Sequence, residues 1–210
     1  MKIEVTSVCS RDGGAAVCVS VRLSDGENSE RRELILLASQ YSELRVAKGE
    51  IDADDFDRLQ SAAELCSAVR RGMALLGYGA CSKRALTLKL RTKGIAPDMA
   101  RSAADLLERI GYIDETADAQ RVAERCVKKY WGKSRISAEL FSKGYSDQAV
   151  RAALDSLDEV DFAELCAEYI EDKYRVPPSE PEQRRKLFSA LTRRGFSSSD
   201  IKDAIRKLES

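Results

Sequence analysis

The chain has 210 residues, and its 35 basic side chains balance its 35 acidic ones, so the formal net charge is zero. This length is sufficient for one large domain or two small ones with a buried core. The sequence has no apolar run of membrane-spanning length and no signal-peptide pattern, which argues against a membrane or secreted protein. It also has no histidine, the side chain that most often acts as a general base in enzymes. We therefore expect a cytoplasmic protein that is rich in helix.

The first 50 residues predict a small β element. Residues 2–9 and 15–23 alternate apolar and polar side chains, and the Asp12-Gly13 pair between them is typical of a hairpin turn. A third strand is expected at residues 33–38, and a short helix that begins near Tyr41 is predicted to end at Gly49. A sheet of this size needs helices packed against it to be stable.

Six cysteines are scattered along the chain, and none forms a Cys-x-x-Cys pair. Without histidine partners this pattern favours reduced, buried thiols over a zinc site, so we predict no metal and no cofactor. Cys9 and Cys18 fall opposite each other in the predicted hairpin, which leaves a disulfide there as the alternative to two free thiols.

A long helix is predicted from Asp52 to about Leu76, where the Gly-Tyr-Gly run at residues 77–79 ends it. Asp52 suits the N-cap, and Asp54 and Asp55 suit the first turn, where the helix dipole favours anions. A capped, solvated helix start explains these carboxylates better than an acid–base pair does. Because the chain has neither a nucleophile–base pair nor a phosphate-binding glycine loop, we predict that it is not an enzyme.

One segment occurs three times in the rest of the chain. Each copy has a leucine, a basic residue three positions later, then glycine and a large apolar residue, and the three glycines are Gly94, Gly144 and Gly195. Spacings of 50 and 51 residues are typical of stacked supersecondary units. Each glycine suits the left-handed position that ends a helix, and apolar residues at helical spacing predict a second helix after it. These equivalent apolar positions are Ala100, Val150 and Ile201; Ala103, Ala153 and Ala204; Ala104, Leu154 and Ile205; and Leu107, Leu157 and Leu208.

The predicted fold is therefore mainly α, with three tandem three-helix repeats after the small N-terminal β element. The first repeat takes the long helix and helices near residues 82–93 and 97–110. The second has helices near 115–130, 133–143 and 146–157, and the third has helices near 159–174, 182–194 and 198–208. This predicts four segments, at residues 1–50, 51–112, 113–158 and 159–210.

Charge is unevenly distributed despite the zero total. Residues 70–97 carry seven basic side chains and no acid, whereas residues 147–172 carry nine acids and one basic residue. Two interpretations remain open: solvated helix faces with internal ion pairs, or a face that binds a charged partner. On the second interpretation, the basic residues of the middle helices form the predicted binding face: Lys83, Arg84, Lys89, Arg91, Lys93, Lys133, Arg135, Lys143, Arg184, Arg185, Arg193 and Arg194.

Two motifs resemble those of the RecX regulators. Residues 111–115 read Gly-Tyr-Ile-Asp-Glu, and residues 132–144 contain Arg-Ile-x-x-Glu-Leu-x-x-Lys-Gly, which is similar to the central pattern of that family. Residues 82–94 and 191–208 resemble its first and last repeats, and the β element resembles the N-terminal extension of its longer members. The chain departs from the family at residues 79–81, where an arginine is common, and at Asp118, where a phenylalanine is common.

The resemblance implies a non-enzymatic modulator of the RecA recombinase that acts in DNA repair, recombination and the SOS response. Members of the family are arrays of three-helix repeats that lodge in the groove of the RecA–single-stranded DNA filament. They generally inhibit its strand exchange, ATP hydrolysis and co-protease activity. The implied partner is the RecA filament, with weak DNA contact, and we expect the chain to act as a monomer.

Other classes of function remain open. Two helices joined by a glycine turn resemble a helix-turn-helix, so a nucleic-acid-binding protein with repeated units of this kind is the main alternative. Neutral net charge argues against tight autonomous DNA binding, because that affinity comes from phosphate neutralisation. Trp131 is predicted to pack at a repeat junction, with base stacking as its alternative role. A helical scaffold for another protein is a third class.

Overall fold

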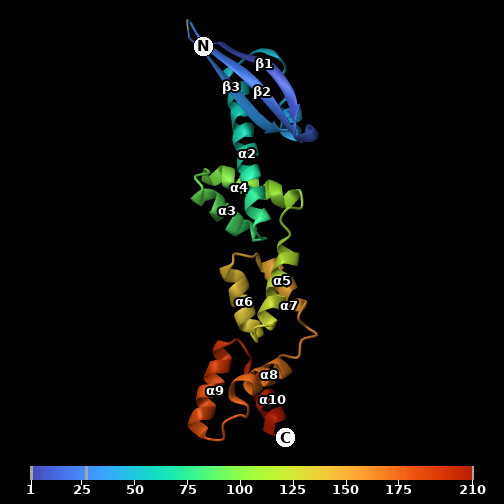
Figure 1. The fold of residues 1–210 in the computed structure, drawn as a ribbon, viewed down its shortest axis with the longest axis vertical. Helices are drawn as coiled ribbons and strands as arrows, with labels where there is room; N and C mark the ends of the chain where they lie inside the picture. The colour runs from blue at the N-terminus through green and yellow to red at the C-terminus, as the bar shows by residue number, and fades with distance from the viewer. Residues whose placement is uncertain (1, 27, 210) are drawn as a thin grey trace. The chain divides into compact units, whose positions relative to one another are not determined.

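The computed structural model of the protein describes residues 2–26 and 28–209 (Figure 1). Over these residues it is mainly helical, with ten α-helices and an N-terminal sheet, so the predicted fold class is confirmed. The chain divides into two compact units. The first unit consists of two segments, the chain up to Gly79 and Leu86–Tyr112. The second unit consists of Ala80–Ala85 and the chain from Ile113 onward.

The sheet has four antiparallel strands in the order β3-β2-β1-β4. Their bounds are β1 (Lys2–Arg11), β2 (Ala16–Asp25), β3 (Asn28–Leu37) and β4 (Gly49–Ile51). A 3₁₀ turn at Asp12–Gly14 joins β1 to β2, and both of its glycines have positive φ, as the predicted hairpin requires. Cys9 lies opposite Cys18 in the register, and both are free thiols in the structure.

The sequence prediction was wrong about Gly49. Helix α1 (Ala38–Leu44) starts and ends earlier than predicted, and Arg45, with φ of 53°, takes the left-handed position that follows it. Gly49 instead begins β4 and pairs with Val5. The strand was missed because three residues are too few to show a period of two, and a glycine after a helical pattern is usually its stop.

The first unit joins the sheet to a group of three helices. Helix α2 (Ala53–Gly77) starts where predicted, because the Asp52 carboxylate accepts a hydrogen bond from the Asp55 N–H at 2.7 Å. Figure 1 shows α2 running from the sheet towards α4. Its first half packs on the apolar face of the sheet, in a core formed by Ile3, Val5, Val19, Val21, Leu23, Leu36, Val46, Phe56, Leu59 and Ala62.

The second half of α2 packs against α3 (Lys83–Thr92) and α4 (Pro97–Arg109). A Cβ at Gly72 of α2 would lie 2.5 Å from Leu107 Cδ1, so this glycine permits the close approach of α2 and α4. Leu86 and Leu90 of α3 are completely buried, as are the small side chains on the inner face of α4. The opposite, outer face of α3 is exposed to solvent.

The second unit contains two more groups of three helices that share one core. Its helices are α5 (Glu115–Val127), α6 (Lys133–Ser142), α7 (Asp147–Asp155), α8 (Phe162–Tyr174), α9 (Pro181–Arg193) and α10 (Ser198–Glu209). The repeated leucines Leu90, Leu140 and Leu191 all have 0% exposure. The repeated glycines have φ of 84°, 80° and 93°, which confirms the predicted left-handed helix ends.

A junction of the same kind occurs twice in the second unit. The Ser82 hydroxyl, just before α3, donates to the Lys143 carbonyl at 2.7 Å, and the Gly132 N–H, just before α6, donates to the Arg194 carbonyl at 2.9 Å. Ser82 and Gly132 are 50 residues apart, and Lys143 and Arg194 each directly precede a repeat glycine. The start of one middle helix thus contacts the glycine turn after the next one.

Candidate partner interface

The structure places all twelve predicted binding residues on the middle helices α3, α6 and α9 or within one turn of their ends. They fall into three groups: cations paired with acids inside the chain, cations stacked on aromatic rings, and cations with neither contact. The groups matter because an internal partner already neutralises part of the charge that a binding partner would use.

Lys133, Lys143 and Arg184 have acidic partners. Lys133 Nζ lies 3.2 Å from Asp158 and 5.5 Å from the centre of the Phe162 ring, and Lys143 lies 3.3 Å from Glu139. Arg184 pairs with Glu209. Lys133 and Arg184 are 51 residues apart, and so are their partners. Equivalent ion pairs therefore link the middle helix of each group to the end of its last helix or to the residues just after it. Exposed pairs of this kind are worth about 0–1 kcal/mol each.

Arg135 and Arg194 stack on aromatic rings. The Arg135 guanidinium lies 4.1 Å from the centre of the Trp131 ring, and that of Arg194 lies 3.9 Å from the Tyr169 ring. Trp131 is half-buried and packs against the core shared by the two helix groups. This position fits its predicted role as a junction aromatic.

Lys83 has interactions of its own within the described chain. The remaining six are exposed and make no ion pair with any residue that the structure describes: Arg84, Lys89, Arg91, Lys93, Arg185 and Arg193. Three of them lie close together at the end of α3: Lys89, Arg91 and Lys93. We call these three residues the α3 cluster. None of its three side chains is paired with an acid among residues 2–26 and 28–209.

Two contributors to this surface were missed by the sequence prediction. Arg71 of α2 donates from Nη1 to the Lys93 carbonyl at 3.2 Å, which brings a further cation to the α3 cluster. Leu88 of α3 is 50% exposed, although its neighbours Leu86 and Leu90 are buried. The sequence alone does not distinguish Leu88 from the buried leucines of the same helix, because the difference lies in its position on the outer face of α3.

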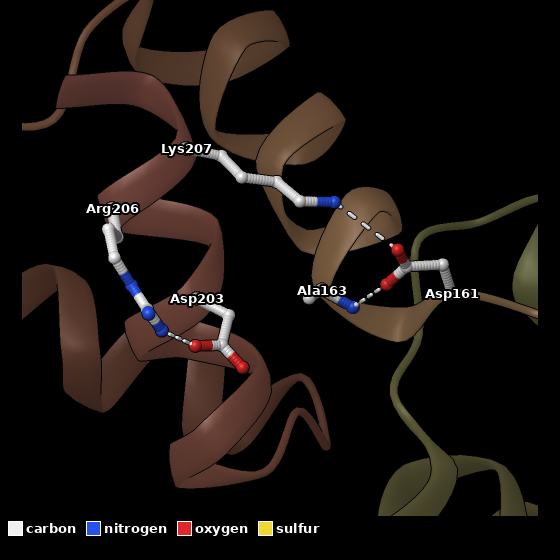
Figure 2. A pocket seen from close by; sticks show the side chains of 5 residues that line it. All are labelled: Asp161, Ala163, Asp203, Arg206 and Lys207. Atoms are coloured by element: carbon white, nitrogen blue, oxygen red, sulfur yellow. Dashed lines mark hydrogen bonds and ion pairs between the residues drawn. The ribbon is translucent and has the colours of Figure 1, made fainter. Parts of the chain in front are cut away.

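The hollow at the N-terminus of α8 offers less to a partner. Figure 2 shows its lining residues Asp161, Ala163, Asp203, Arg206 and Lys207. Lys207 bonds to Asp161 at 3.2 Å and to Glu164 at 2.7 Å, and Arg206 pairs with Asp203. Hydrogen bonds from the Glu164 N–H and from Lys207 lower the pKa of Asp161, which is also the N-cap of α8. The charges in this hollow therefore stabilise the helix group itself.

Three buried thiols are not activated as nucleophiles. Burial raises the pKa of Cys66, Cys126 and Cys166, to about 12 for Cys166, so each remains a protonated thiol at neutral pH. The described residues contain no group of three or more side chains placed to hold a metal ion. None of the helices in the described ranges is long and apolar enough to cross a bilayer.

Comparisons with known proteins give one consistent result. Residues 159–205 match the family model described as "RecX, third three-helix domain". The "Regulatory protein RecX" of Xanthomonas axonopodis pv. citri (strain 306) is 34% identical over 139 residues, which cover 66% of this chain and 85% of that protein. The corresponding protein of Stenotrophomonas maltophilia (strain K279a) is 32% identical over the same length.

A solved structure shares nearly the whole fold. The "Crystal structure of regulatory protein RecX" superposes with a TM-score of 0.74 at 20% identity and covers 96% of this chain and 99% of that one. Because that alignment spans both the sheet and the helices, the N-terminal β element also has a counterpart in a known fold. At this identity the likeness concerns the fold alone.

Proposed function

This chain belongs to the RecX family of regulatory proteins, and from that premise we propose that it binds the RecA–single-stranded DNA filament and inhibits its activities. The inhibited activities would be ATP hydrolysis, strand exchange and co-protease function. The protein would act in DNA repair by occupying a surface of the filament, without catalysing a reaction of its own.

The observation that supports this proposal most is the α3 cluster. Lys89, Arg91 and Lys93 are exposed and lack acidic partners in the described chain, whereas the two basic counterparts of Lys93 in the later groups are engaged: Lys143 pairs with Glu139, and Arg194 stacks on Tyr169. Cations kept unpaired on a folded surface cost stability through mutual repulsion, and a surface that binds an anionic partner recovers that cost.

We also propose that the helix groups within residues 51–112, 113–158 and 159–210 act as successive contact modules. The match of residues 159–205 to a single three-helix domain supports the last boundary. Each module presents one middle helix, so contacts at one group should add to those at the next when all of them can engage together.

The test is RecA ATPase activity on single-stranded DNA, titrated with this protein. Inhibition that is complete well below one molecule per RecA protomer is expected if the protein blocks filament growth or caps its ends. ATPase activity that stays unchanged up to a molar excess, with no co-sedimentation of the protein with filaments, would refute the proposal.

The second candidate is direct nucleic-acid binding, which the exposed cations of the α3 cluster also suit. Binding to single- and double-stranded DNA should be measured without RecA across a range of salt concentrations. Sub-micromolar affinity with a steep salt dependence would favour this candidate, because the affinity would then come from phosphate neutralisation.

A further inference from the structure

We infer that the end of α3 is a docking site for an acidic protein segment that carries one large apolar anchor residue. This inference deepens the proposed function and rests on it for the claim that the partner is a protein. The site combines an apolar hollow with the α3 cluster, and all of its residues belong to the first unit.

The hollow has an aliphatic lining. Leu88, Ile95 and Pro97 surround it together with Arg91, Thr92 and Gly94, and it encloses about 500 Å³ open to solvent. Gly94, with φ of 84°, turns the chain between α3 and α4 and has no heavy atom within 4 Å of its Cβ position. The turn therefore leaves space above it that a side chain from a partner can fill.

The rim of the hollow is positive. Arg91 lines it, Lys89 and Lys93 are its neighbours in sequence, and Arg71 reaches the Lys93 carbonyl. Residues 70–97 contain no acid, and Asp98, the next one along the chain, pairs with Arg101. Charge complementarity therefore selects an anionic segment for this rim.

The same positions in the other two helix groups do not form such a site. Leu88 corresponds to Ala138 and Ser189, which are 50 and 101 residues further along the chain. Ile95 is half-buried, whereas its counterparts Tyr145 and Phe196 are 6% and 3% exposed and belong to the core. The first group is thus distinguished by an exposed leucine and an uncovered apolar residue at its glycine turn.

An acidic peptide fits this combination better than a nucleic acid does. Phosphates would satisfy the cations, but bases bind folded surfaces by stacking on aromatic rings, and the lining of this hollow is aliphatic. A leucine or phenylalanine side chain of a partner would bury apolar surface against Leu88 and Ile95. The acids beside it would meet the cations of the rim.

The experiment uses the full-length protein and three fluorescein-labelled probes. The first is a short glutamate-rich peptide with Phe-Leu at its centre, the second has Ser-Ser in their place, and the third is an oligo-dT of equal charge. We expect the Phe-Leu peptide to bind roughly tenfold more tightly than the Ser-Ser peptide, because one buried apolar anchor is worth about that factor.

Two variants locate the effect. Leu88→Ser should abolish the preference for Phe-Leu while leaving the affinity for Ser-Ser unchanged, and Lys89→Glu with Arg91→Glu should weaken binding of both peptides. Ala138→Ser, at the equivalent exposed position of α6, is the matched control and should change neither affinity. Circular dichroism checks that Leu88→Ser is folded, which is expected for an exposed side chain.

Equal affinity for the two peptides, a preference that survives Leu88→Ser, or tighter binding of oligo-dT than of both peptides would each overturn the inference. These outcomes are separable from failure of the proposed function. Inhibition of RecA without a peptide preference would remove the inference alone, whereas a peptide preference without any effect on RecA would remove the proposed function and keep the site.

Discussion

The hydroxyl of Tyr145 donates a hydrogen bond to the carboxylate of Asp118, and both side chains are buried. Tyr145 follows the glycine turn after α6, and Asp118 lies in the first turn of α5, so the bond ties two helices of the same group together. Arg121 lies 3.5 Å from Asp118 and balances part of its charge. Tyr145 thus supplies the buried Asp118 carboxylate with a hydrogen-bond donor.

Replacing Tyr145 by phenylalanine should destabilise the protein by about 1–3 kcal/mol, because the Asp118 carboxylate would lose its buried donor. Urea unfolding followed by circular dichroism measures the change. Tyr174→Phe is the control, because Tyr174 is 44% exposed and its loss of a hydroxyl should have little effect. Equal free energies of unfolding for the two variants would show that the buried bond contributes nothing.

The same pair predicts a loss of stability in alkali. Burial, the hydrogen bond to Asp118 and the charge of that carboxylate raise the pKa of Tyr145 above its ordinary value of 10.0. The stabilisation is complete below pH 10, and it is lost as the pH rises further, because the unfolded chain releases the phenol proton first. Melting temperatures measured from pH 8 to 11.5 should fall more steeply for the wild type than for Tyr145→Phe; parallel curves would contradict this.

Glu115 joins the starts of two helices. One carboxylate oxygen accepts from the Lys83 N–H at 2.8 Å, and the other accepts from the Ser146 N–H at 3.1 Å. Glu115→Ala should cost about 1–2 kcal/mol, because two N-terminal donors lose their acceptor. Glu124→Ala, at an exposed acid of the same helix, should cost much less in the same urea titration.

Gly132 should not tolerate a side chain. A Cβ there would lie 2.1 Å from the Gly195 carbonyl oxygen, so the junction would have to open. Gly132→Ala should destabilise the second unit by about 3 kcal/mol or more. Gly77→Ala is the control, since no heavy atom lies within 4 Å of its Cβ position and alanine is favoured in a helix. A Gly132→Ala variant as stable as Gly77→Ala would disprove the close approach.

Local patterns were sufficient to predict most of the fold. The leucine–glycine segments predicted three helix ends at Gly94, Gly144 and Gly195, because left-handed backbone and helical spacing are properties of neighbouring residues. The start of α2 at Asp52 followed from capping chemistry in the same way. In contrast, β4 depends on pairing with β1, which lies more than 40 residues earlier in the sequence, and its own three residues carry no strand signal.

The composition of the candidate interface could be predicted from the sequence, but the pairing of its charges could not. The list of basic residues could be predicted, but Lys133 and Asp158 are 25 residues apart, and their pairing follows from the packing of α6 with α7. Arg194 stacks on Tyr169 for the same kind of reason. Sequence therefore could not separate these cations from the α3 cluster, and it could not show that Leu88 is exposed.

The most direct test of this account compares three proteins in the RecA ATPase assay on single-stranded DNA. They are the wild type, a triple variant in which Lys89, Arg91 and Lys93 are all replaced by glutamate, and a charge-matched control in which Arg109, Arg151 and Lys202 are replaced by glutamate, all three exposed and outside the predicted binding face. We expect the α3 variant to fold normally and to need at least tenfold more protein for half-inhibition, and we expect a smaller loss in the control. Inhibition by the α3 variant at wild-type concentrations would contradict this expectation.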